Sequence, residues 1–134
     1  MTSYLYEFTI NIYEGDLARL FAQTDWAADR SHDTIRKLLA NTPLCLCVWD
    51  GGHLIGFGRA VTDDLFRALI EDVVVDQPYR GQGIGAEIMR RLLERLDHVE
   101  EILINCHDNL IPFYEQLGFK RTSFTYMNIW KGSS

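Results

Sequence analysis

The chain has 134 residues, a size typical of one domain, and its 47% of apolar residues suffice for a hydrophobic core. Its formal net charge of −6 argues against a nucleic-acid partner, which requires a basic surface. No apolar run approaches the roughly 20 residues of a membrane-spanning helix, and no secretory signal pattern is visible near the N-terminus. We therefore expect one domain over residues 1–134, with no nucleic-acid or membrane partner.

The cysteines are few and odd in number. Cys45, Cys47 and Cys106 lack the spacing of metal ligands, so we expect no metal site. All three are predicted to be reduced core residues, which favours a cytoplasmic location.

Strand and helix patterns alternate along the chain without a linker or repeat. Ser31 is a predicted helix cap, Pro43 ends that helix, and Asp50-Gly51-Gly52 is typical of a hairpin turn. In chain order the predicted elements are a strand at 4–13, helices at 15–23 and 31–42, strands at 44–49, 53–61 and 67–75, a long helix at 83–96, a strand at 101–106, a short helix at 110–116, and one or two strands within 119–130.

A glycine-rich turn joins the strand at 67–75 to the long helix. Residues 79–85 read Tyr-Arg-Gly-Gln-Gly-Ile-Gly. Glycines let the backbone approach a ligand closely, and the first turn of a helix offers free N–H groups and the positive end of the helix dipole. The turn therefore predicts a cradle for a phosphate or pyrophosphate, to which Arg80 adds a fixed charge.

Two common glycine motifs do not fit this turn. A P-loop requires Lys-Ser or Lys-Thr where Ala86-Glu87 stands, and the third glycine of a dinucleotide fingerprint would fall later than Gly85. The remaining pattern is Arg-x-x-Gly-x-Gly, filled by Arg80, Gly83 and Gly85.

A second segment, 109–119, reads Asn-Leu-Ile-Pro-Phe-Tyr-Glu-Gln-Leu-Gly-Phe. With the glycine turn, the motifs Phe113-Tyr114-Glu115 and Leu117-Gly118-Phe119 make the chain resemble the GNAT superfamily of N-acetyltransferases. The run 70–75 before the turn locally resembles the glucosamine-phosphate N-acetyltransferase branch. The resemblance implies the GNAT fold, a mixed α/β (α+β) domain whose mostly antiparallel sheet is flanked by helices in the order β-α-α-β-β-β-α-β-α-β.

The resemblance implies acetyl-CoA as cofactor. The strands at 67–75 and 101–106 would run parallel and splay apart, and the backbone of the first would bind the pantetheine arm. The implied cofactor-binding residues are Val73, Val74, Val75, Arg80, Gly81, Gln82, Gly83, Ile84, Gly85, Ala86, Asn109 and Tyr114. For Asn109 a plain helix cap is the alternative.

The chemistry implied is direct attack of a neutral amine on the thioester. Tyr114 occupies the family's general-acid position, and a phenol is protonated at neutral pH. Glu71 is the candidate base or ammonium ligand. Period-two alternation places it and Asp72 on opposite faces of their strand. Asp72, Trp26 and Arg59 are further candidates for substrate binding. The alternative for Asp72 is a structural salt bridge, and the alternative for Trp26 is core packing. A water chain is the alternative to a carboxylate base.

We thus expect an acetyl-CoA-dependent N-acetyltransferase acting on a primary amine of a small molecule. The alternatives are a catalytically silent acyl-CoA-binding domain and an enzyme acting on peptide or protein amines. Dimers that pair through C-terminal strands are common in the family, and Tyr126, Met127, Ile129 and Trp130 are candidates for such a strand in a homodimer.

Overall fold

The structure is a computed structural model that describes residues 3–132. It divides into two compact units, the first ending at Ile104 and the second beginning at Asn105. The first unit contains β1 (Leu5–Phe8), α1 (Glu14–Phe21), α2 (His32–Asn41), β2 (Leu44–Asp50), β3 (His53–Thr62), β4 (Arg67–Val75), the 3-10 turn η1 (Gln77–Tyr79), α3 (Ile84–Arg95) and β5 (Glu101–Leu103). The second contains the 3-10 turn η2 (Asp108–Leu110) and α4 (Ile111–Gln116).

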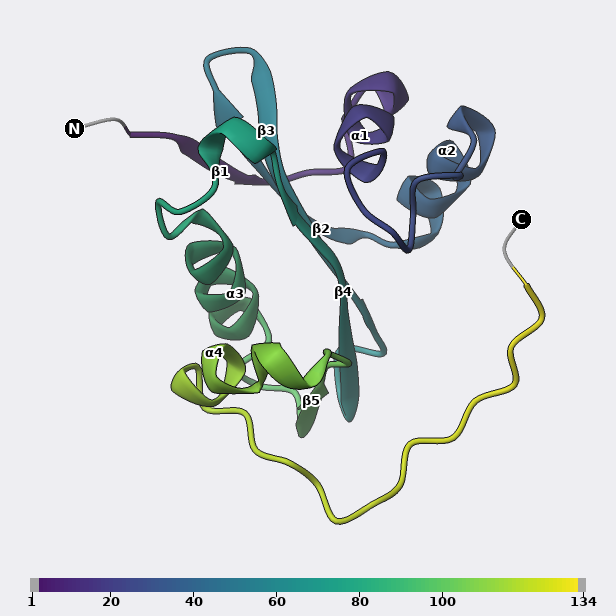
Figure 1. Ribbon diagram of the computed structural model, residues 1–134, viewed down its shortest axis with the longest axis vertical. Coiled ribbons are helices and arrows are strands. Elements are labelled where there is room, and N and C mark those ends of the chain that lie inside the picture. The colour runs from purple at the N-terminus through teal and green to yellow at the C-terminus, as the bar shows by residue number, and fades with distance from the viewer. Residues whose placement is uncertain (1–2, 133–134) are drawn as a thin grey trace. The chain divides into compact units, whose positions relative to one another are not determined.

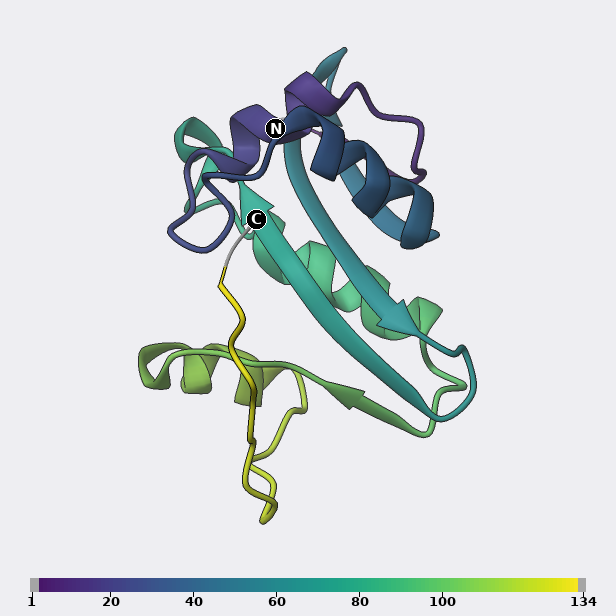
Figure 2. The same ribbon diagram turned by 90° about the vertical axis from the view of Figure 1, so that its right-hand side faces the viewer.

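The first unit is a five-stranded sheet covered by helices on both faces. The strand order is β1-β2-β3-β4-β5, antiparallel through β4, with β5 parallel to β4. Figure 1 shows α1 and α2 on one side of this sheet and α3 on the other. Figure 2 shows β3 and β4 as a long twisted hairpin. The mixed sheet confirms the expected fold class.

Apolar side chains with the expected periodicity hold the helices to the sheet. On α3 and just after it, Ile84, Ile88, Leu92 and Leu96 are all buried, as their four-residue spacing predicted. Gly58 of β3 allows this close packing, because a Cβ there would lie 2.8 Å from Ile88 Cγ2. On the other face, Leu17, Leu20 and Phe21 of α1 pack in one core with Phe57 and Val74.

Local signals explain the ends of α2. The Ser31 side chain accepts a hydrogen bond from the Thr34 backbone N–H at 3.1 Å, which confirms the predicted cap. The helix ends at Asn41, two residues before Pro43. None of the helices in the described part of the chain is long and apolar enough to span a bilayer.

A β-bulge interrupts the pairing of β3 with β4. Phe57 pairs with Val74 and Arg59 pairs with Glu71, so Gly58 stands opposite two residues, Asp72 and Val73. Asp72 takes up the extra residue with a φ of 56°, in the left-handed region. The expectation that Glu71 and Asp72 lie on opposite faces is therefore wrong, because strict alternation fails at a bulge.

Four other expectations are corrected. Residues 119–130 contain no strand. β5 ends at Leu103 rather than at residue 106, and β1 covers only Leu5–Phe8. Cys45 and Cys47 are buried as predicted, and burial raises the pKa of Cys47 to about 12, whereas Cys106 is exposed. Cys106 follows the shortened β5, so its predicted place in the core is lost.

Candidate functional site

The glycine turn has the backbone geometry of an open cradle. Gly81 and Gly83 have φ values of 81° and 83°, a backbone conformation that residues with a side chain rarely adopt. A Cβ built on either glycine would meet nothing within 4 Å. Gly83 is also the N-cap residue of α3, so the free N–H groups of the first helical turn follow it. This part of the backbone therefore suits an anionic ligand such as the CoA pyrophosphate.

Side chains that lie just before β1 and just after α1 support the turn. Arg80 Nε donates to the Val75 carbonyl at 2.9 Å, which anchors the guanidinium at the end of β4 while the residue stays exposed. Gln23, just after α1, accepts from the Gln77 backbone N–H at 2.9 Å. The Tyr4 hydroxyl donates to Gln82 Oε1 at 2.9 Å. These hydrogen bonds hold the turn to neighbouring parts of the first unit, and Arg80 keeps an exposed position beside the glycines.

β4 keeps a free edge along the half that leads to the turn. β5 pairs with β4 only from Arg67 to Leu69, opposite Glu101 to Leu103. The register ends there, so β4 residues from Ile70 to Val75 have no strand partner on the β5 side in the described first unit. The parallel pairing is confirmed, and the unpaired backbone is what the binding of an extended amide-bearing arm requires.

Asp72 lies at the centre of a buried polar cluster. Its carboxylate accepts hydrogen bonds from Trp26 Nε1 at 3.0 Å, Arg30 Nη1 at 2.8 Å and Arg59 Nε at 2.7 Å. The Asp72 side chain is 0% exposed, whereas those of Arg30 and Arg59 are 24% and 14% exposed. Arg59 also donates to the Thr42 hydroxyl at 3.2 Å. The cluster therefore joins β3, β4 and the connection between α1 and α2.

The guanidinium groups keep Asp72 ionised. Burial opposes the charged form, but the hydrogen bonds and charges of Arg30 and Arg59 outweigh it, and the pKa of Asp72 lies below its ordinary value. The geometry thus favours the salt-bridge alternative for Asp72, and its direct contact with a substrate stays a prediction. Arg59 and Trp26 lie in the same cluster, and Trp26 is 55% exposed, so it is not a core residue.

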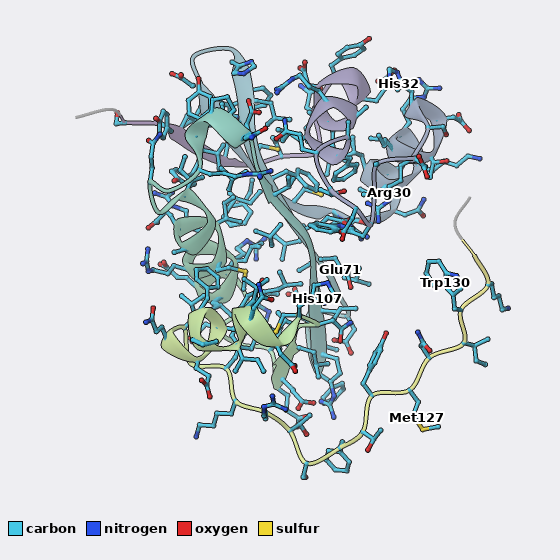
Figure 3. The ribbon with its side chains drawn as sticks, viewed as in Figure 1. Arg30, His32, Glu71, His107, Met127 and Trp130 are labelled. Atoms are coloured by element: carbon cyan, nitrogen blue, oxygen red, sulfur yellow. The ribbon has the colours of Figure 1, made fainter. Side chains whose placement is uncertain are left out.

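Glu71 directly precedes Asp72, but its surroundings shift the pKa of its carboxyl in the opposite direction. It lies opposite Arg59 across the bulge, and side chains directly opposite share one face of a sheet. Figure 3 shows Glu71 and Arg30 on the α1–α2 side of β4. Burial, and then the charge of Asp72, raise the pKa of Glu71 against the opposing effect of Arg59 and Arg30. No hydrogen bond or ion pair of its side chain occurs among residues 3–132.

Sequence reasoning missed two residues that organise this unit. Arg30 lies 42 positions from its partner Asp72, so no local pattern marks it. Asp76, directly after β4, accepts from Gln23 Nε2 at 2.8 Å and from Arg19 Nη1 at 3.1 Å, and so joins α1 to the start of the glycine turn.

The second unit contains Tyr114 on α4. Its ring packs edge-on against Phe113 and Phe119, with centroids 5.0 Å and 5.8 Å apart. Burial, and then the Cys106 thiol, raise the pKa of Tyr114, which keeps its hydroxyl protonated at neutral pH. Asn109 lies in η2 and does not cap α4, whose N-cap residue is Leu110 without a side-chain bond. The helix-cap alternative for Asn109 is therefore wrong.

Comparison with known proteins agrees with this geometry. Residues 6–119 match the acetyltransferase (GNAT) family. An "uncharacterized N-acetyltransferase ycf52-like" protein of Prochlorococcus marinus is 30% identical over 84% of this chain and 69% of its own length. A GNAT-family protein of Xanthomonas campestris pv. campestris has the same fold, with a TM-score of 0.87 and 22% identity over 97% of this chain and 94% of that one.

Two plant relatives have more specific names. Serotonin N-acetyltransferase 2, chloroplastic, of Oryza sativa subsp. japonica is 30% identical over 78% of this chain and 55% of its own length. Histone acetyltransferase TAP1 of Glycine max is 38% identical over 51% of this chain and 30% of its own. The chain thus spans little more than half, or less, of these two relatives.

The chain belongs to the GNAT family of acetyltransferases. This confirms the expected family and the expected class of enzyme. Members of the family generally use acetyl-CoA as co-substrate.

The glycine cradle is tested by substituting Gly83 with valine. A branched side chain at this open, left-handed position would occupy the space above the first turn of α3 and strain the backbone. We expect acetyl-CoA affinity to fall at least tenfold, or about 1.4 kcal/mol, by calorimetry. Gly51→Val is the matched control, since Gly51 has a φ of 59° and equally open surroundings in the β2–β3 turn. Equal affinity of the two variants would contradict the cradle.

The Asp72 cluster is tested by thermal and denaturant unfolding of Asp72→Asn. This change leaves two largely buried guanidinium groups without their carboxylate. We therefore expect the free energy of unfolding to fall by about 3–5 kcal/mol. Because the pKa of Asp72 is lowered in the folded state, its contribution is complete at neutral pH and declines as the pH falls below about 4. The exposed Asp29→Asn is the control. A loss no larger than that of the control would show that the cluster contributes little.

Proposed function

We propose that the protein transfers the acetyl group of acetyl-CoA to a primary amine of a small molecule by direct attack within a ternary complex. The observation that carries the proposal is the unpaired, half-buried Glu71 on the part of β4 that has a free edge and leads to the glycine turn. This arrangement supports a binding site for the cofactor and a carboxylate for the amine on one continuous piece of chain.

The cofactor supplies the activated acetyl group and the thiolate leaving group. On the protein side, we assign its pyrophosphate to the N–H groups of residues 81–86 and to Arg80, and its amide-bearing arm to the backbone of Val73, Val74 and Val75. Gln82, Ile84, Gly85, Ala86 and Asn109 complete the proposed contacts. The fit is supported by the open space over Gly81 and Gly83 and by the unpaired backbone of β4.

Glu71 is assigned to the amine. An alkylammonium must lose a proton before it attacks, and a carboxylate with a raised pKa is a better proton acceptor than an ordinary one. The same charge also attracts the ammonium form. Trp26 and Arg59 are assigned to the surroundings of the acceptor. Trp26 Nε1 donates a hydrogen bond to Asp72, and the residue is 55% exposed.

Tyr114 is assigned as the proton donor to the thiolate. Its raised pKa keeps the phenol protonated, and the edge-on contacts with Phe113 and Phe119 fix the ring. Serotonin is a small primary amine and histones are proteins, so the names of two relatives leave both classes of acceptor open. We favour a small molecule because the proposed amine site rests on one carboxylate, and an enzyme acting on protein amines is the alternative.

The role of Glu71 is tested by Glu71→Gln, which keeps the shape and removes the charge. If Glu71 is the base, turnover falls and the rising limb of the pH–rate profile shifts or disappears, while the acetyl-CoA KM stays nearly constant. If it only binds ammonium, the amine KM rises and the limb remains. The exposed Glu94→Gln on α3 is the control. Amine kinetics and a pH profile equal to those of the control would exclude both roles and favour a water chain.

Removing only the hydroxyl of Tyr114, as Tyr114→Phe, should lower turnover by roughly 10²- to 10⁴-fold, the span of a lost proton donor. Acetyl-CoA affinity should barely change. Single-turnover kinetics isolate the chemical step, and Tyr13→Phe, at a 64% exposed position, is the control. Wild-type single-turnover rates in Tyr114→Phe would mean that Tyr114 only packs.

We also propose that the protein is a homodimer that pairs through residues 119–132. Phe124, Tyr126, Met127, Ile129 and Trp130 are 71–86% exposed, and Figure 3 labels Met127 and Trp130 on this segment. Apolar residues occur at both alternating sets of positions, as in a strand with both faces covered. Its three aromatic side chains represent roughly 450–750 Å² per copy, close to the ~800 Å² per partner of a standard interface.

The dimer is tested by light scattering coupled to size-exclusion chromatography. Ile129→Asp places a charge in the proposed interface and should convert the dimer to a monomer. Leu65→Asp, at a 63% exposed apolar position outside the segment, should leave the mass of a dimer. A monomeric wild-type protein at tens of micromolar would contradict the proposal.

A further inference from the structure

The bulge in β4 brings two carboxylates to one face of the sheet. Glu71 lies opposite Arg59, and the Asp72 carboxylate accepts a hydrogen bond from the same Arg59 at 2.7 Å. Two adjacent carboxylates at such a place would compete for any cation within reach.

The cations around this pair are not shared equally. Both Arg30 Nη1 and Arg59 Nε donate to Oδ2 of Asp72, and Trp26 Nε1 donates to its Oδ1. Glu71 receives no such bond within residues 3–132, although Arg30 and Arg59 are close enough to affect its pKa. The charged groups that face Glu71 are Asp72 on β4, Arg59 on β3, and Arg30 from the connection between α1 and α2.

We propose that Asp72 is a positioning residue: by holding Arg30 and Arg59 on its own carboxylate, it keeps the neighbouring Glu71 carboxylate unpaired and available to the amine. This inference rests on the proposed role of Glu71. Its structural part, the division of the cations between two carboxylates, does not depend on that role.

Two physical effects of Asp72 both raise the pKa of Glu71. The negative charge of Asp72 disfavours ionisation of Glu71, and the retained guanidinium groups are prevented from forming an ion pair with it. If Asp72 became neutral, both Arg30 and Arg59 would lose their partner, and Glu71 would be the adjacent carboxylate. An ion-paired Glu71 would be a weaker base and would no longer offer a free charge to an ammonium group.

The direct test is a titration of the Glu71 side-chain carboxyl carbon by NMR, with the resonance assigned by its loss in Glu71→Gln. In the wild-type protein we expect a pKa above the ordinary value of about 4.3. In Asp72→Asn the pKa of Glu71 should fall by roughly one unit or more, the size of the effect of a nearby opposite charge. An unchanged Glu71 pKa in folded Asp72→Asn would overturn the proposal.

A neutral version of the cluster covers the case in which Asp72→Asn does not fold. The triple variant Asp72→Asn, Arg30→Gln, Arg59→Gln removes all three charges of the cluster, so that neither guanidinium group is left without its carboxylate. Its Glu71 pKa should stay above the ordinary value, since both the carboxylate and the competing cations are gone and burial remains. A Glu71 pKa at or below the ordinary value in this variant would overturn the proposal.

Kinetics separate this inference from the proposed function. In Asp72→Asn the rising limb of the pH–rate profile should move to lower pH together with the NMR pKa, and turnover should fall. If the NMR pKa moves while neither Asp72→Asn nor Glu71→Gln alters the pH profile, the positioning by Asp72 holds, and the role of Glu71 as base is refuted. If Glu71→Gln abolishes the limb while Asp72→Asn leaves both limb and pKa in place, the positioning is refuted and the base is retained.

Discussion

The buried carboxylate of Asp72 is the constraint on which the first unit depends. It accepts three hydrogen bonds from two separate parts of the chain: Trp26 and Arg30 in the connection between α1 and α2, and Arg59 in β3. A charge with no exposure requires such compensation. The same residue adopts the left-handed conformation that places the bulge in β4. One residue therefore holds the α1–α2 connection through its side chain and sets the course of the strand that leads to the glycine turn through its backbone.

The consequence is that two adjacent acids have opposite properties. Asp72 is compensated and its pKa lies below the ordinary value, whereas Glu71 is half-buried, has no hydrogen-bond or ion-pair partner within residues 3–132, and has a raised pKa. A pair of carboxylates with diverging pKa values is a common feature of acid–base sites. Membership of the GNAT family gives this divergence a chemical context, because an amine must lose a proton before acyl transfer.

The sequence predicted the parts of the fold that rest on local signals. The bounds of β4, the Ser31 cap and the buried stripe of α3 follow from alternation, capping chemistry and helical periodicity, and all three are confirmed. The bulge was missed, because alternation along a single strand contains no information on its partner, and Asp gives only a weak signal for a left-handed residue. Arg30 was missed because its contact joins residues 42 positions apart.

The C-terminal segment shows a different limit. Its residues have the composition of a strand, yet a strand requires a hydrogen-bonded neighbour, and no strand forms within residues 119–132. The motif residues Arg80, Gly83 and Tyr114 were identified by resemblance. The structure adds to that resemblance the open space over Gly83 and the aromatic contacts of Tyr114.

The central claim, acetyl transfer to a small primary amine, is tested most directly by the rate of free-thiol release from acetyl-CoA across a panel of amines. The panel should contain arylalkylamines, polyamines, amino sugars, amino acids and a lysine-containing peptide. The account predicts amine-dependent, saturable thiol release with at least one small amine and a slower rate with the peptide. The account would be contradicted if acetyl-CoA raised the melting temperature of the protein but no amine of the panel supported thiol release. It would also be contradicted if the peptide were the one acceptor that supported thiol release.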